Sequence, residues 1–141
     1  MKIKLFRNDI TVPKKSHLPD SGLDIFLPKD ITLQPFETKT IGLGLGVMVP
    51  EGHAGILVPR SSIAMKGLII QTSIIDPDYT GEIHLIITNC SNKEIKLWTS
   101  QRVCSICCFN VLNPYVEIVE EFPTTERGSD GLGSSGLWCQ S

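Results

Sequence analysis

The sequence has no long hydrophobic run. No stretch approaches the ~18 apolar residues that a membrane-spanning helix needs, and residues 1–7 (MKIKLFR) lack the hydrophobic core of a secretory signal peptide. We therefore expect a soluble protein without a signal peptide or a membrane partner, located inside the cell, in the cytoplasm or the nucleus.

An excess of positive charge is also missing. The 141 residues carry 13 Lys and Arg against 15 Asp and Glu, which gives a formal net charge of -2 at pH 7 and a sequence pI of about 5.9. A positive surface is the usual footprint of nucleic-acid binding, and no run of basic residues is interleaved with aromatics. We do not expect polymeric nucleic acid as a partner.

The cysteines do not form a disulfide framework or a metal-binding pattern. There are five, an odd number, in a chain long enough to build a core without cross-links. Cys104 and Cys107 have the spacing of a metal or redox pair, but they lie in a run that reads as a strand, and no second Cys or His pair lies at ligand spacing. We interpret the cysteines as reduced thiols, and this pair as buried, small apolar side chains.

Helical periodicity is nearly absent. Only residues 61–67 (SSIAMKG) resemble a short helix, with serine at the start and glycine at the end. Elsewhere short apolar runs alternate with turns, which is typical of an all-β barrel or sandwich. After Phe122 almost nothing can be buried, so we expect one β domain over residues 1–122 and a mobile Gly/Ser-rich arm over residues 123–141. The expected strands are residues 3–6, 23–27, 31–33, 38–49, 54–58, 68–71, 82–88, 95–98, 103–111 and 115–119.

The most informative segment is the turn Asp76-Pro-Asp-Tyr-Thr-Gly81, which has β-type runs on both sides. We expect a rigid hairpin, because Pro77 fixes one backbone angle and Gly81 can adopt a positive φ. Such a turn would present two carboxylates and the ring of Tyr79 with little freedom, as a binding site requires. Ordinary turn chemistry, in which Asp side chains bond their own backbone, is the alternative.

Three other segments carry polar groups suited to phosphate or a metal ion. Pro59-Arg-Ser-Ser62 leads from a strand into the short helix and is a candidate anion site, although a serine there can also simply cap the helix. The arm repeats these ingredients from Arg127 to Ser135. Asp24, just inside a strand, is able to hold water or a metal, or to serve as a turn residue. The Walker pattern of P-loop NTPases is absent.

Five segments in order resemble the motifs of the trimeric dUTPase family, from about residue 20 to residue 137. They are Ser21-Gly-Leu-Asp24, Pro59-Arg-Ser-Ser-Ile-Ala64, Ile74-Ile-Asp-Pro-Asp-Tyr-Thr-Gly81, Ser100-Gln-Arg-Val-Cys-Ser105 and Arg127-Gly-Ser-Asp-Gly-Leu-Gly-Ser-Ser-Gly136. The resemblance implies a distorted, jelly-roll-like β-barrel that assembles into a homotrimer with shared active sites. It also implies Mg²⁺-dependent hydrolysis of dUTP to dUMP and pyrophosphate, by water attack on the α-phosphate.

The resemblance also implies a role for each matching residue. Asp76 would activate the attacking water, and Tyr79 would pack under the deoxyribose and exclude a 2′-hydroxyl. Asp24 would bind Mg²⁺ through water. Uracil would be read by the backbone near Ser73, Ile74 and His84, and the arm would close over the site with Arg127 on the γ-phosphate. The remaining residues implied to bind substrate are Arg60, Ser61, Ser62, Ser105, Leu132, Gly133, Ser134 and Ser135.

The chain departs from the family's usual pattern in three places. Leu132 stands where a phenylalanine usually stacks on uracil, Ser105 replaces a glutamine, and Ser73 replaces a glycine. Two alternatives follow: a non-catalytic or weakly active nucleotide-binding module, and dCTP deaminase, which shares the fold. The deaminase carries a catalytic Glu where this chain has Ile86, and an apolar side chain cannot transfer protons.

Overall fold

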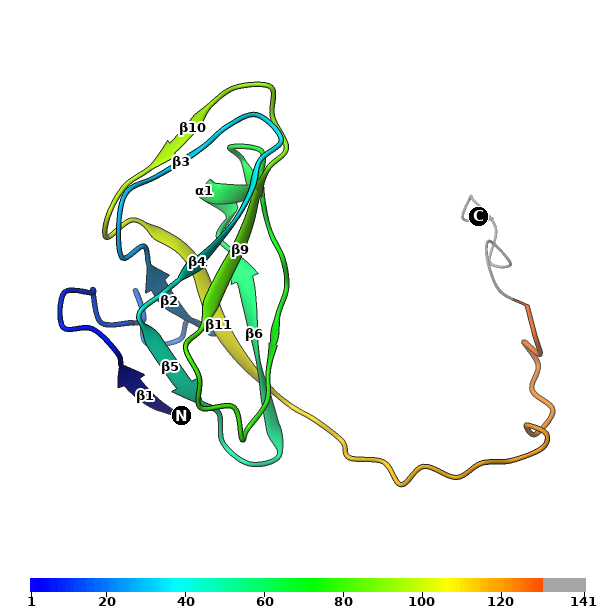
Figure 1. Ribbon diagram of the computed structural model, residues 1–141. Helices are drawn as coiled ribbons and strands as arrows, with labels where there is room; N and C mark the ends of the chain where they lie inside the picture. Colours follow the sequence, from blue (N-terminus) through cyan, green and yellow to red (C-terminus); the bar gives the residue numbers. More distant parts are fainter. Residues whose placement is uncertain (131–141) are drawn as a thin grey trace.

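The computed structural model describes residues 1–130 of the chain (Figure 1). Nearly all of their regular secondary structure is strand, with one short helix, which confirms the expected all-β class. The strands are β1 (Lys2–Leu5), β2 (Gly22–Phe26), β3 (Ile31–Leu33), β4 (Thr38–Gly42), β5 (Leu45–Met48), β6 (His53–Pro59), β7 (Leu68–Ile70), β8 (Ile74–Ile75), β9 (His84–Asn89), β10 (Ile95–Leu97) and β11 (Arg102–Asn110); the helix is α1 (Ser61–Ala64).

The strands form small antiparallel sheets around one core. The largest sheet has the order β2-β11-β6-β8, and the next has the order β4-β9-β7. Two further pairs, β1 with β5 and β3 with β10, complete the described body. Apolar residues from these sheets pack together inside, among them the fully buried Leu57, Leu85 and Ile106. Burial of such side chains is the main stabilising contribution to the fold.

The run expected as one strand over residues 38–49 is two strands. The chain bends at Leu43 and Gly44, and Gly44 has a φ of 72°, a backbone conformation that favours glycine. After the bend the partner changes, because β4 pairs with β9 whereas β5 pairs with β1. The alternation of apolar residues runs through the bend, so it carries no sign of the change of sheet.

The strand expected over residues 115–119 is absent. After β11 the chain leaves the body as an extended segment, coloured yellow to orange in Figure 1. Tyr115 and Ile118 are almost fully exposed there. A strand needs a neighbour to bond its backbone, and this segment has none among the described residues.

The helix is shorter than expected. It ends at Ala64, and a turn then leads to Gly67, whose φ is 78° and whose N–H bonds to the Ala64 carbonyl at 2.9 Å. The buried side chain of Ile63 anchors the helix to the core. Within residues 1–130, no helix is long and apolar enough to cross a membrane.

Candidate active site

The segment from Ile74 to Ile83 is a crossing between sheets, so the expected hairpin pairing is wrong. β8 pairs with β6, while β9 pairs with β4 and β7. Gly81 does not need a positive φ either. Gly81 is glycine for a steric reason, since a Cβ at this position would lie 2.5 Å from the Tyr79 hydroxyl oxygen. The neighbouring Gly46 also has no room for a side chain, because its Cβ would lie 2.8 Å from the Gly81 carbonyl oxygen.

A gap opens between β8 and β9, because the chain pairs with β9 along β7 but with β6 along β8. β7 pairs with β9 up to Ile70, and the Gln71 N–H still bonds to the Ile86 carbonyl at 2.9 Å. The Ser73 carbonyl already accepts from the Leu57 N–H of β6, at 3.3 Å. Backbone groups of alternate residues point to opposite sides of a strand, so the backbone groups of Ile74 and His84 face this gap from its two sides.

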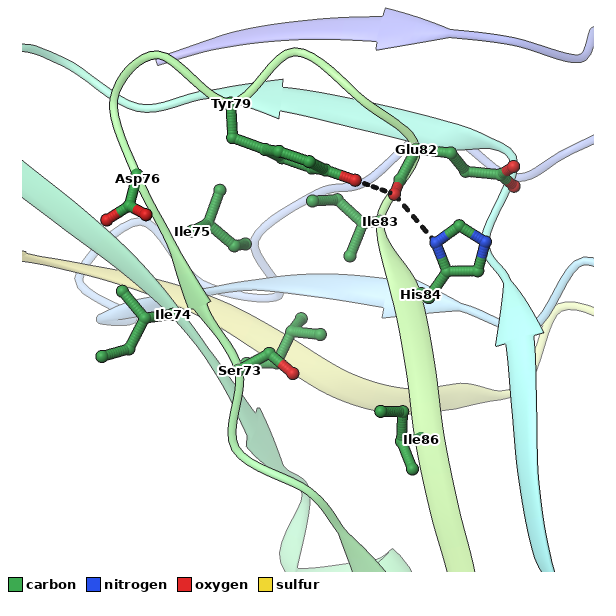
Figure 2. A pocket seen from close by; sticks show the side chains of 10 residues that line it. Ser73, Ile74, Ile75, Asp76, Tyr79, Glu82, Ile83, His84 and Ile86 are labelled. Atoms are coloured by element: carbon green, nitrogen blue, oxygen red, sulfur yellow. Dashed lines mark hydrogen bonds between the residues drawn. The ribbon is translucent and has the colours of Figure 1, made fainter.

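The gap contains a cavity of about 220 Å³. Figure 2 shows its walls, which come from β8, the turn and the start of β9. The base of the cavity is aliphatic, whereas its rim carries polar groups. The lining residues are Leu57, Ser73, Ile74, Ile75, Asp76, Tyr79, Glu82, Ile83, His84 and Ile86.

The ring of Tyr79 is fixed against the turn. Its hydroxyl donates to the Glu82 carbonyl at 2.7 Å, and Nδ1 of His84 lies 3.0 Å from the same oxygen (Figure 2). The Glu82 carboxylate accepts from the Gly44 N–H at 2.7 Å. Glu82 thus ties Tyr79, His84 and the bend between β4 and β5 together, a role that the sequence did not indicate.

Asp76 lies at the end of β8, on the rim of the cavity, and is exposed. Its carbonyl accepts from the Tyr79 N–H at 3.2 Å, which closes the turn. Among the described residues its carboxylate has no hydrogen bond or ion pair, so it is available to a ligand or to water. Asp78 is an exposed turn residue outside the cavity lining.

A second polar cluster surrounds Asp24 on β2. Ser105 lies opposite Asp24 in the register of β11, and β6 on the far side of β11 brings Arg60 within reach. The Arg60 guanidinium and the Ser105 hydroxyl donate to one oxygen of Asp24, the latter at 3.0 Å, and the Ser16 hydroxyl donates to the other at 2.8 Å. Nε of Arg102 lies 3.6 Å from that second oxygen.

Asp24 is 4% exposed and is held as a carboxylate. Burial alone raises its pKa, but the hydrogen bonds from Ser16, Ser105 and Arg60 outweigh this effect and hold the pKa below its ordinary value. Ser16 could not be identified as a partner of Asp24 from the sequence, because a loop serine eight residues before Asp24 gives no periodic or motif signal.

Ser61 and Ser62 are exposed in the first turn of α1, next to Arg60. The helix has no side-chain cap, so the simple capping interpretation of these serines is wrong. Arg60, Ser61 and Ser62 present donors at one end of β6, whereas the single O–H of Ser105 is already donated to Asp24. Arg127 lies on the extended segment and bonds to the Asp130 carbonyl at 2.9 Å. Leu132, Gly133, Ser134 and Ser135 lie outside the described residues.

The cavity and the Asp24 cluster lie at opposite ends of β6. Ile75 pairs with Gly55 near the start of β6, and Arg60 follows its last residue. At about 3.3 Å per residue, the two sets of side chains are separated by roughly 15 to 20 Å along the strand. The structure thus brings the expected site residues together in two groups, not one.

Residues 1–130 contain no group of three or more His, Cys, Asp or Glu that could hold a metal ion. The one candidate, Asp24, already accepts hydrogen bonds on both oxygens. Direct ligation does not suit this arrangement. A hydrated Mg²⁺ held mainly by phosphate oxygens needs only an outer contact from such a carboxylate.

Comparison with known proteins gives a consistent result. The family model described as dUTPase matches residues 8–136. A deoxyuridine 5'-triphosphate nucleotidohydrolase from Hydrogenobaculum sp. is 34% identical over 139 residues, covering 96% of each chain. The mouse protein of the same name is 31% identical, over 89% of this chain and 78% of its own.

Solved structures of dUTPases also resemble this chain over nearly its whole length. The dUTPase of Staphylococcus bacteriophage 80alpha with dUPNHPP superposes with a TM-score of 0.90, at 27% identity, over 96% of this chain and 98% of that one. Its G164S mutant with dUpNHpp gives a TM-score of 0.89 at 28% identity, with the same coverage. These likenesses confirm the expected dUTPase-like fold.

Proposed function

The chain belongs to the dUTPase family and is a hydrolase of that family; on this premise we propose that it converts dUTP to dUMP and pyrophosphate by Mg²⁺-dependent attack of water on the α-phosphate. The observation that carries the proposal is the cavity beside Asp76 and Tyr79. It has an aliphatic floor, backbone groups facing its interior and, at its rim, a carboxylate that is free among the described residues. That combination suits a flat, uncharged nucleobase inside the cavity, with a phosphate ester beyond the rim.

Backbone groups would recognise the base. The backbone groups of Ile74 and His84 face the gap from opposite sides. No strand of the described residues pairs with both of them there, because β8 pairs with β6 and β7 pairs with β9. An amide and a carbonyl on facing strands can imitate the edge of a complementary base. Tyr79, held by Glu82, would form the surface on which the deoxyribose packs, leaving no room for a 2′-hydroxyl.

Asp76 would act as the general base. Its carboxylate is exposed and without a partner among the described residues, so it can accept a proton from a water molecule that attacks the α-phosphate. Asp76→Asn keeps the size and removes the basic oxygen. The variant is expected to bind dUMP as the wild type does and to lose turnover by at least ~100-fold; an unchanged rate would remove Asp76 from this role.

Arg60, Ser61 and Ser62 would hold the triphosphate, and Ser105, whose O–H is donated to Asp24, would contact it through a bridging water. Arg60 is fixed by Asp24 yet keeps 32% of its side chain exposed, so part of its guanidinium can meet a phosphate oxygen. Mg²⁺ would neutralise charge on the phosphates, with Asp24 contacting it only through water. The arm, with Arg127, Leu132, Gly133, Ser134 and Ser135, would cover the site and exclude bulk water.

A complete site needs a second copy of the chain. Asp76 and Arg60 must both act on one triphosphate, yet they lie roughly 15 to 20 Å apart along β6. The exposed apolar side chains after β11, such as Tyr115 and Ile118, also lack cover from the part of the chain that the structure describes. Both observations support sites shared between copies, as in the homotrimer that the family resemblance implies, and the extended arm can reach a neighbour.

The direct test is a substrate profile. The protein is incubated with Mg²⁺ and each of dUTP, dTTP, dCTP, dATP, dGTP and UTP, and pyrophosphate and ammonia are measured. Pyrophosphate release from dUTP alone is the expected result. Ammonia from dCTP would identify a deaminase, against which the aliphatic Ile86 in the cavity wall argues. No turnover with any nucleotide would identify a binding module.

A further inference from the structure

The polar side chains around the cavity are mostly engaged within the protein. The Tyr79 hydroxyl and the His84 ring share the Glu82 carbonyl, and the Glu82 carboxylate is held by the Gly44 N–H. Asp76 is free among the described residues but lies on the exposed rim, where the proposed function places the phosphates. These groups shape the cavity without reaching its aliphatic base.

The Ser73 hydroxyl is different. Ser73 is partly exposed and lines the cavity, and Figure 2 shows its oxygen directed across the gap, toward the side where Ile86 lies. No hydrogen bond of this hydroxyl occurs within residues 1–130. Its neighbours in the wall include Leu57 and Ile75, which offer no polar side-chain atom. A base that displaces water here must satisfy this hydroxyl or leave it unpaired at a cost.

The position of Ser73 indicates which atom of the base it meets. Ser73 precedes Asp76 by three residues along an extended strand, a separation of roughly 10 Å. The sugar and phosphate must lie toward Asp76, so the ring of a pyrimidine enters with N1 toward the rim. The atom opposite N1 across the ring is C4, and its substituent is the group that points toward Ser73.

We infer that the Ser73 hydroxyl donates a hydrogen bond to the oxygen on C4 of the bound pyrimidine and is a substrate-binding side chain of this chain's own. The inference rests on the proposed function for the identity of the base. It assigns to Ser73 a direct contact with the substrate, in addition to the backbone groups that face the gap.

The test measures binding without turnover. Dissociation constants are measured by titration for dUMP and for the analogue whose base is 2-pyrimidinone, which lacks the C4 oxygen. Three proteins are compared: the wild type, Ser73→Ala, and Thr72→Ala as the control. Thr72 is the exposed neighbour, is not part of the cavity wall, and points to the other side of an extended chain.

The wild type is expected to prefer dUMP, and Ser73→Ala to bind dUMP about 5- to 10-fold more weakly, the typical effect of one hydrogen bond. The preference for dUMP over the analogue should shrink by the same factor, while Thr72→Ala keeps the wild-type values. Ser73→Cys, which keeps the size but donates weakly, should behave as Ser73→Ala and guards against an effect of lost volume.

An unchanged preference in Ser73→Ala would overturn the inference, and so would an equal loss in Thr72→Ala. Failure of the wild type to bind dUMP would overturn it together with the proposed function. Binding of dUMP without hydrolysis of dUTP would refute the proposed function alone, because the contact to the base is measured at equilibrium.

Discussion

Replacement of Asp24 by asparagine tests the cluster that fixes Arg60. The substitution changes one oxygen into an NH₂ group and removes a charge, with almost no change in volume. In the wild type both carboxylate oxygens accept hydrogen bonds, from Arg60 and Ser105 on one and from Ser16 on the other. In Asp24→Asn the NH₂ group must face at least one of these donors, and a donor cannot accept.

The expected loss follows from these contacts. A hydrogen bond to a charged group contributes about 1.5 to 3 kcal/mol. Arg60 keeps 32% of its side chain exposed, so water replaces part of what it loses, and the two serine hydroxyls can rotate. We therefore expect Asp24→Asn to lower the free energy of unfolding by about 2 to 3 kcal/mol, which for a chain of this size lowers the Tm by about 10 °C.

The assay is thermal unfolding followed by circular dichroism at pH 7. All proteins are measured at one concentration, because the proposed assembly would make the Tm concentration-dependent. Asp9→Asn is the matched control, since Asp9 also pairs with an arginine, Arg7, but both side chains are exposed. Its Tm should equal that of the wild type, because exposed pairs contribute little. A Tm for Asp24→Asn within 2 °C of the wild type, a difference of under about 1 kcal/mol, would refute the reasoning.

The effect should also depend on pH in one direction. The fold holds the pKa of Asp24 below its ordinary value, so the stabilisation is fully present above the unfolded pKa of about 3.9 and is lost as the pH falls through the folded value. The Tm difference between wild type and Asp24→Asn should therefore be constant from pH 5 to 7, about one unit or more above that pKa, and shrink in more acidic buffers. A difference that grows on acidification would contradict the assignment.

Three further predictions concern the turn, the core and a thiol. Gly81→Ala places a Cβ 2.5 Å from the Tyr79 hydroxyl, so it should lower kcat/KM for dUTP by about 10-fold and leave the circular dichroism spectrum intact; unchanged turnover would count against the role of the ring. Asn89→Ala leaves three backbone carbonyls without the amide that now bonds to them, so the free energy of unfolding measured in urea should fall by about 3 kcal/mol. An unchanged free energy of unfolding would mean that water replaces the amide. Burial raises the pKa of the Cys104 thiol to about 12, so a thiol reagent at pH 8 should label the exposed Cys90 and spare Cys104 until the protein unfolds. The labelled positions are identified by mass spectrometry, and labelling of Cys104 in the native protein would contradict this prediction.

The local structure of most strands could be predicted from the sequence, but their partners could not. The apolar runs around Ile74 and Leu85 indicate strands because their side chains alternate or are β-branched. Which strands pair depends on contacts between residues far apart in the chain. The turn after Asp76 looks like a hairpin turn, yet its two strands belong to different sheets, and that separation creates the cavity.

The family resemblance names the candidate site residues one by one, and their roles stay predictions, whereas it does not indicate the geometry that the structure shows. The sequence gives no sign that Asp24 is engaged by Arg60 and Ser105, because this contact depends on the register of β11 between β2 and β6. It also gives no sign of the distance between Asp76 and Arg60. The false strand at residues 115–119 has the same origin, since a short apolar run indicates a strand without supplying its neighbour.

The shared site is the central claim, and mixing two inactive variants tests it most directly. Asp76→Asn removes the carboxylate, and Arg60→Gln removes the proposed phosphate contact while keeping a donor for Asp24. The variants are unfolded, mixed in equal amounts and refolded, and release of pyrophosphate from dUTP is measured. If each site of a trimer combines one copy's cavity with another copy's Arg60, random mixing restores about a quarter of the wild-type activity. Mixed trimers, verified by mass, that remain as inactive as the separate variants would contradict the account.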